Sequence, residues 1–276
     1  MANYEISYDL RKKVHRITIC LMLTAAVEHG LVNAHKLKAW IEETEDINEA
    51  FKQYFVSGYP HIFGAVEYSF SLGLLVQLTN LQRTFLWSYA DVFVMLVGSA
   101  VTFRVNQFCR KVQTLSQKQI NDKQAWQSVR NDYSKLFKLC QTTNRHLSNT
   151  IIVSFLFNLY FILIQLFSSL KQTADVVKKA YFLLSVLFIS IRIACICVFG
   201  GNVYEEWANI GCYLNSIPSE AYNAEAERLI QYVLTCPLSL TGNHFFYITR
   251  SLMLKIAGAI VTYELVLIQF YENQLR

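Results

Sequence analysis

Residues 149–170 read NTIIVSFLFNLYFILIQLFSSL, a run without a single charged side chain. A helix needs roughly 20 predominantly apolar residues to cross a bilayer, and this run has that length. Residues 180–200, AYFLLSVLFISIRIACICVFG, form a second clear run. These two stretches predict a helical protein that crosses a membrane more than once.

The composition of the whole chain supports this prediction. Hydrophobic residues make up 53% of the chain and charged residues 16%, whereas soluble domains carry about 25% charged residues. Three more segments are apolar enough to cross: residues 17–32, 84–103 and 245–270. We therefore expect an all-α, polytopic membrane helical bundle with five spans. Residues 61–78 are apolar but interrupted by two glycines and a glutamate. We interpret them as an interfacial or packed extension of the second span, and the alternative is an independent crossing.

Loop charges predict how the chain is oriented. The loop of residues 104–145 carries nine Lys and Arg residues against Asp122 and Asp132, which places it in the cytoplasm. The loop after the first span is acidic, as expected outside. A short loop with Lys171, Lys178 and Lys179 opposes this orientation, but the larger charge excess decides. Five crossings then put the C-terminus outside the cell.

The spans and loops divide the chain into segments. Residues 1–103 hold the first two spans with an acidic outer loop, 104–148 form a basic cytoplasmic helical loop, 149–200 hold two spans, 201–243 form a cytoplasmic helical segment, and 244–276 hold the last helix and a short extracellular C-terminus.

The cytoplasmic segments show helical patterns of their own. Residues 108–139 have apolar side chains at helical spacing and basic ones on the other faces. Such a stretch lies against anionic lipid, or it continues the flanking spans into the cytoplasm and packs there. Residues 221–234 form another helical pattern between Pro218 and Pro237, and Pro237 separates it from the last span.

Catalytic and metal-binding motifs are absent from the sequence. The histidines are scattered, no glycine-rich phosphate loop exists, and no Cys/His spacing indicates zinc. We expect no enzyme activity, no cofactor and no metal. The net charge of +5 is explained by the loop that faces anionic membrane lipid, so nucleic-acid binding is not expected.

The last span carries polar residues at membrane depth, namely Thr262, Tyr263, Glu264 and Gln269. Such residues are costly in lipid and usually mark a functional path. At 100° per residue, Thr262, Val266 and Gln269 form one stripe with Phe270 alongside, while Glu264 points away from it. The alternative is that these residues form hydrogen bonds to neighbouring helices and only hold the bundle together.

The order Thr262-Tyr263, five mostly apolar residues, then Gln269-Phe270 resembles the signature that closes the last transmembrane helix of insect gustatory receptors. Glu264 after the Tyr resembles the sugar-receptor branch of that family. Residues 84–93, TFLWSYADVF, and 238–250, LSLTGNHFFYITR, are similar to further stretches of the branch, as is Val27-Glu28-His29.

This resemblance implies a fold and a function. Family members have seven transmembrane helices, so we expect that the first two helices are missing and that Met1 is not the natural start. The implied protein is a ligand-gated cation channel subunit in the plasma membrane of chemosensory neurons, which opens on binding sugar from outside. It would assemble as a homo- or hetero-tetramer with sister gustatory receptors. The last helix would line the pore with Thr262, Val266, Gln269 and Phe270.

Two other functions compete with the channel. A transporter should show internal repeats and Gly/Pro-interrupted helices in both halves, but the three prolines all fall in loops. A G-protein-coupled-type receptor for another small ligand would have the opposite orientation to the one that the loop charges predict.

A sugar site needs aromatic platforms together with carboxylate, amide and guanidinium groups. The outward halves of the first four spans offer Glu28, His29, Arg83, Trp87, Asp91, Asn158, Gln165 and Tyr181. Trp87 and Asp91 are one turn apart and share a helix face, which suits stacking and hydroxyl binding. Alternatively, Arg83 and Asp91 form an ion pair and Trp87 is an interfacial anchor. We expect Arg192 to be a structural partner of a carbonyl or a glutamate.

Overall fold

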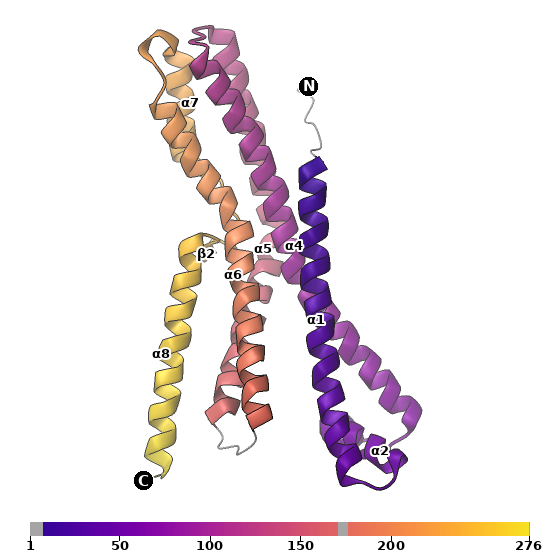
Figure 1. The fold of residues 1–276 in the computed structure, drawn as a ribbon. Helices are drawn as coiled ribbons and strands as arrows, with labels where there is room; N and C mark the ends of the chain where they lie inside the picture. The colour runs from indigo at the N-terminus through magenta and orange to yellow at the C-terminus, as the bar shows by residue number, and fades with distance from the viewer. Residues whose placement is uncertain (1–7, 171–175, 276) are drawn as a thin grey trace. The chain divides into compact units, whose positions relative to one another are not determined.

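The computed structural model describes residues 8–170 and 176–275, and these are mostly helical (Figure 1). The elements in chain order are α1 (Tyr8–Glu43), α2 (Ile47–Gly58), α3 (Pro60–Phe63), α4 (Phe70–Gln117), α5 (Lys123–Leu170), α6 (Val176–Asn215), the 3₁₀ turn η1 (Ser219–Ala221), α7 (Ala224–Thr235), β1 (Thr241–Gly242), β2 (Phe246–Tyr247) and α8 (Arg250–Leu275).

Five of these helices are long and apolar enough to cross a membrane: α1, α4, α5, α6 and α8. The predicted membrane helical bundle with five spans is confirmed. At 1.5 Å per residue, the 48 residues of α4 or α5 extend about 72 Å. The hydrocarbon core of a bilayer is only about 30 Å thick. Both helices therefore project well beyond the membrane, so residues 108–139 continue the spans instead of forming a separate helix along the lipid.

Several predicted boundaries need correction. Residues 70–78 belong to α4, as expected for an extension of the second span, but residues 61–69 contain the end of α3 and a turn. The last helix begins at Arg250 and not near Phe245, because β1 and β2 form a hairpin before it. The short loop with Lys171 lies outside the described residues, as do the side chains of Lys178 and Lys179.

The chain folds as two compact units, residues 15–90 and residues 91–276 with the N-terminal 14 residues. In the 15–90 unit, α2 packs its aromatic face on the start of α4. Phe55 is buried, and a Cβ at Gly73 would lie only 2.7 Å from its ring. Phe51 meets Phe70 edge to face, with ring centroids 5.9 Å apart. Glycine at position 73 thus permits the close packing of α2 on α4.

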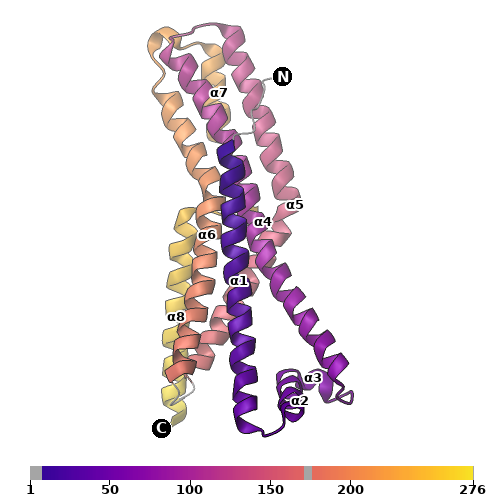
Figure 2. The same ribbon diagram turned by 45° about the vertical axis from the view of Figure 1, so that its right-hand side comes forward.

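In the 91–276 unit, helices α5, α6 and α7 form a bundle, and the end of α4 joins it through Phe108, whose ring centroid lies 5.5 Å from that of Tyr133 (Figure 2). Trp126, Tyr133, Ile210 and Leu229 are fully buried in its core. The Trp126 indole donates to the carbonyl of Ile120 at 2.8 Å, so this large side chain is buried without leaving its polar atom unsatisfied.

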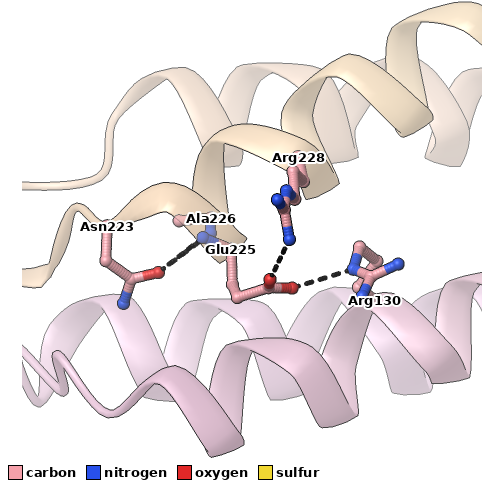
Figure 3. A network of polar contacts seen from close by, with 5 residues as sticks. All are labelled: Arg130, Asn223, Glu225, Ala226 and Arg228. Atoms are coloured by element: carbon pink, nitrogen blue, oxygen red, sulfur yellow. Dashed lines mark hydrogen bonds and ion pairs between the residues drawn. The ribbon is translucent and has the colours of Figure 1, made fainter.

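A polar network begins α7 and ties it to α5 (Figure 3). Asn223 caps the helix, since its side-chain oxygen accepts from the backbone N–H groups of Glu225 and Ala226 at 3.0 and 3.1 Å. Glu225 accepts from Arg228 at 2.7 Å and from Arg130 of α5 at 3.0 Å. Burial by itself would raise the pKa of the Glu225 carboxyl, but the hydrogen bonds from the two arginines outweigh it and lower that pKa. The carboxylate therefore stays charged and connects the two helices.

Three glycines allow backbones to approach closely in this unit. A Cβ at Gly98 of α4 would lie 2.9 Å from the Cα of Gly200 in α6, and one at Gly201 would lie 3.1 Å from the backbone nitrogen of Arg250. Helix α4 therefore crosses α6 at nearly backbone distance, and the chain that enters α8 rests on the neighbouring turn of α6. Small residues permit this kind of contact between membrane helices.

Replacing Gly98 with alanine tests this crossing. The added Cβ meets backbone that cannot rotate away, so we expect Gly98→Ala to lower the stability by about 1–3 kcal/mol. Gly211→Ala is the matched control, because nothing lies within 4 Å of a Cβ there and alanine favours a helix by about 1 kcal/mol over glycine. Thermal unfolding of the purified protein in detergent measures both. Equal or higher stability of Gly98→Ala would contradict the crossing.

Candidate functional site

Helix α8 has two unlike faces. Ile256 is buried, and Ile260 and Glu264, at one-turn intervals along the same face, are half-buried against their own chain. Tyr263 and Leu265 are more than half exposed. Apart from Ile256, residues 250–270 of α8 are all half-buried or exposed. Much of this helix is therefore left for lipid or for another chain to cover.

The predicted stripe lies on the open face. Thr262, Val266, Gln269 and Phe270 are all exposed, and Phe270 keeps 66% of its surface. The Thr262 hydroxyl donates to the carbonyl of Gly258 at 2.9 Å within the same helix, so it needs no neighbouring helix as a partner. The half-buried Glu264 points away from the stripe, as the helical spacing predicts.

The chain segment that leads into α8 is held by side chains of α5. The Asn144 amide donates to the carbonyl of Ser239 at 2.8 Å, and its oxygen accepts from the backbone N–H of Thr241 at 3.1 Å. The Tyr133 hydroxyl donates to the carbonyl of Cys236 at 2.6 Å. Residues 236–240, which lack a regular structure, and the first residue of β1 thereby obtain partners for their backbone. The start of α8 is fixed relative to α5.

A buried ion pair lies where α4, α5 and α6 meet. Asp91 of α4 is 1% exposed and Arg192 of α6 is 4% exposed, and the arginine donates to the Asp91 carboxylate. From α5, Ser154 donates to the same carboxylate, and the Asn158 amide donates to both of its oxygens at 3.2 Å. Asn158 Oδ1 is itself buried and accepts no hydrogen bond. We call these four residues the Asp91 cluster.

The cluster corrects two predicted pairings. The partner of Asp91 is Arg192 and not Arg83, whose guanidinium donates to Asn80 at 3.0 Å. Arg192 accordingly pairs with an aspartate, whereas the sequence led us to expect a carbonyl or a glutamate. The carboxylate of Asp91 is already satisfied by protein donors, so sugar binding by Asp91 stays a prediction that this geometry does not favour.

A second polar group lies within the 15–90 unit, at the end where α2 packs. The Tyr54 hydroxyl donates to Asn33 at 2.8 Å, and the Tyr59 hydroxyl donates to Gln77 at 3.1 Å. Burial raises the pKa of Tyr54 to about 12 and also raises that of Tyr59, so both remain protonated donors at neutral pH. Hydroxyl and amide groups beside aromatic rings have the chemistry of a sugar site.

The remaining predicted ligand residues are spread over both units. His29 Nδ1 lies 3.1 Å from the Thr84 hydroxyl, and His29 Nε2 is buried without a hydrogen bond. Glu28 and Trp87 are half-buried. In the other unit, the Gln165 amide donates to Ser185 at 3.3 Å. The side chain of Tyr181 lies outside the described residues. The structure thus brings together Asp91 and Asn158 in one unit, whereas Glu28, His29, Arg83 and Trp87 belong to the other.

Among the described residues, no group of three or more His, Cys, Asp and Glu side chains is placed to hold a metal ion.

A family model described as "Trehalose receptor" matches residues 2–276, nearly the whole chain. This chain belongs to the trehalose receptor family.

Similar proteins place this family member among insect gustatory receptors. The Drosophila melanogaster "Gustatory receptor for sugar taste 64f" is 32% identical over 99% of this chain and 58% of its own length. "Gustatory receptor for sugar taste 64a" is 28% identical over 99% and 61%, and "Gustatory receptor 5a for trehalose" is 29% identical over 82% and 51%. The chain spans between about half and three fifths of the length of these relatives. The resemblance to the sugar branch is confirmed.

A solved structure shows the same fold. The insect olfactory receptor OR5 from Machilis hrabei matches with a TM-score of 0.61 and 14% identity, covering 96% of this chain and 70% of that receptor. Its complex with eugenol matches with a TM-score of 0.60. The trehalose receptor family member and this olfactory receptor therefore share a helical membrane fold.

The sequence of this family member did not lead us to predict the Asp91–Arg192 pair or the contacts of Tyr54, Tyr59 and Gln77. Within their predicted spans, residues 84–103 and 180–200, Asp91 and Arg192 are the sole charged residues and have opposite signs. That signal favours a pair, since isolated charges are costly in a membrane. Tyr54, Tyr59 and Gln77 gave no comparable signal, because their contacts depend on how α2 folds back on α4.

Removing one or both charges of the Asp91 cluster tests whether Asp91 and Arg192 neutralise each other in the buried interior. Asp91→Asn leaves Arg192 buried without a counter-charge, and we expect a loss of about 3–5 kcal/mol. The double variant Asp91→Asn/Arg192→Gln removes both charges and should lose much less. Thermal unfolding in detergent and the yield at the cell surface measure this difference. A double variant at least as damaged as Asp91→Asn would show that the two charges are not coupled.

Proposed function

We propose that this chain is part of a sugar-gated cation channel subunit in the plasma membrane of chemosensory neurons. The observation that carries the proposal is the open face of α8, which presents Thr262, Val266, Gln269 and Phe270 on a membrane-length helix. Membership in a family whose similar proteins are named for sugar taste supports sugar as the ligand.

Assembly gives the open face of α8 its partner. We infer a homo- or hetero-tetramer with sister gustatory receptors, in which the α8 stripes of neighbouring subunits surround a common pore. Phe270 rings would exclude water from the closed pore, and Gln269 amides would contact hydrated cations in the open one. Ile256 and Glu264 would meanwhile hold α8 to its own subunit.

The orientation follows from the loop charges. The bundle formed by α7 and the ends of α4, α5 and α6 would lie in the cytoplasm, where the basic residues of segment 104–148 meet anionic lipid. Segment 201–243 would share that compartment, and the C-terminus after α8 would be extracellular. Sugar would then enter from the side on which α2 lies.

The sugar site proposed here includes side chains of the 15–90 unit. Tyr59 and Gln77 add a hydroxyl and an amide to the sequence-predicted Glu28, His29 and Trp87. Trp87 supplies the aromatic face on which a sugar ring stacks. Neither a transporter nor a G-protein-coupled-type receptor is favoured by an observation of the same kind.

Two substitutions test sugar contact in the full-length receptor. Tyr59→Phe removes a hydroxyl, and losing one neutral hydrogen bond should raise the half-maximal sugar concentration about 2- to 10-fold. Trp87→Ala removes the stacking face and should raise it about tenfold. Currents evoked by a panel of sugars measure both. Tyr222→Phe is the control, since this exposed tyrosine lies between η1 and α7. Unchanged dose–response curves would remove both residues from the site.

Phe270→Ala tests the pore. A small side chain leaves the pore wide enough to stay wet, so current without sugar should rise, and Gln269 substitutions should alter permeability ratios among cations. Leu254→Ala is a matched control, because Leu254 is an equally exposed apolar residue of α8 outside the stripe motif. If Phe270→Ala only lowers surface expression and leaves the residual current with wild-type selectivity, Phe270 is a packing residue and not the gate.

A further inference from the structure

We propose that the Asp91 cluster is a positioning device for α8: it sets the relative axial positions of α4, α5 and α6, on which the start of α8 rests. This inference rests on the proposed function only in that the proposed function places the channel gate on α8. None of the four cluster residues needs to touch sugar or a permeating ion for this role.

The cluster restricts sliding of the three helices. Asp91, Arg192, Ser154 and Asn158 are all buried, and every hydrogen bond among them joins two different helices. A slide of one helix by a single turn, about 5.4 Å, would break these bonds. It would leave a carboxylate and a guanidinium separated in a dry interior, which is strongly unfavourable. The three helices are therefore held at one axial position.

About two turns further along, α6 meets the approach to α8, and α4 contacts α6 at the same place. On α4, Gly98 follows Asp91 by seven residues and touches Gly200. On α6, Gly200 follows Arg192 by eight residues and lies under Ile248, while Asn202 accepts from Arg250 at 2.8 Å.

Helix α5 makes the corresponding contact with the β1–β2 hairpin. Phe155, next to Ser154, packs edge to face on Phe246 with ring centroids 5.3 Å apart. Asn149 accepts from Asn243 at 2.7 Å. Ile152 lies 3.1 Å from where a Cβ at Gly242 would be. A shift of α5 would consequently displace the hairpin from which α8 begins.

The Asp91 cluster could also form a second set of hydrogen bonds. Asn158 Oδ1 is buried and accepts no hydrogen bond, although buried polar atoms are normally satisfied. A guanidinium has five N–H donors, so a small movement of α5 against α6 would let Arg192 donate to Asn158 as well. Such a second hydrogen-bonding arrangement would give the cluster the two states that coupling between sites requires.

The experiment uses the double variant Asp91→Asn/Arg192→Gln, which avoids an isolated buried charge. The matched control is Lys111→Gln/Asp132→Asn, which removes another ion pair between α4 and α5, away from the hairpin. Hydrogen–deuterium exchange of the purified receptor follows residues 241–249, with α7 as the internal reference. Sugar-evoked currents, normalised to surface expression, give the half-maximal concentration.

We expect exchange at residues 241–249 to become on the order of tenfold faster in the cluster variant while α7 is unchanged. The half-maximal sugar concentration should change by about 2- to 30-fold, and the control should change neither. Equal acceleration in α7 would indicate a merely structural role and overturn the proposal. So would unchanged exchange, or faster exchange with an unchanged sugar response.

Failure of the proposed function would look different. A wild-type receptor that reaches the surface but passes no sugar-evoked current contradicts the channel assignment. The exchange measurement still decides whether the cluster holds the start of α8, because that readout needs no current.

Discussion

The pairing of Asp91 with Arg192 is the constraint on which the arrangement of α4, α5 and α6 depends. Each charge alone would be costly in the middle of a membrane-spanning segment, and apolar packing in lipid does not by itself choose one helix register over another. A charged pair with hydrogen bonds from Ser154 and Asn158 does choose, because other registers leave a buried charge uncompensated. The close approach of Gly98 to Gly200 is compatible with that register.

Outside the predicted membrane region, stability has a different origin. The 48-residue helices α4 and α5 continue as part of a bundle with α6 and α7, whose core contains Trp126, Tyr133 and Leu229. Side chains of α5 then satisfy the irregular backbone that follows α7, through Tyr133 and Asn144. The chain can therefore leave one helix and begin another without burying unsatisfied backbone groups. The irregular segment therefore allows α7 and α8 to be separate helices with different surroundings.

The spans were predictable because a membrane demands a length and an apolar composition that few other structures share. The continuation of α4 and α5 was not decided by the sequence, since an amphipathic basic pattern suits both a lipid surface and a bundle. The opposite lone charges of Asp91 and Arg192 favour a pair, but that pair was not predicted, because choosing Arg192 over Arg83 requires the helix register. The contact of Tyr59 with Gln77 depends on a fold-back of α2 that no periodicity encodes.

The two faces of α8 have different surroundings. Ile256 and Glu264 face their own chain, and α8 contacts both α5 and α6, so a movement of either helix would reach α8 through its start and along this inner face. Val266 and Phe270 face outward, where no residue of the same chain covers them completely. A helix that is held firmly on both faces could not move without breaking its core, and one held on neither would not follow the bundle. Attachment along one face leaves α8 able to follow small changes in helix register, and in the proposed tetramer its stripe would face the neighbouring subunits.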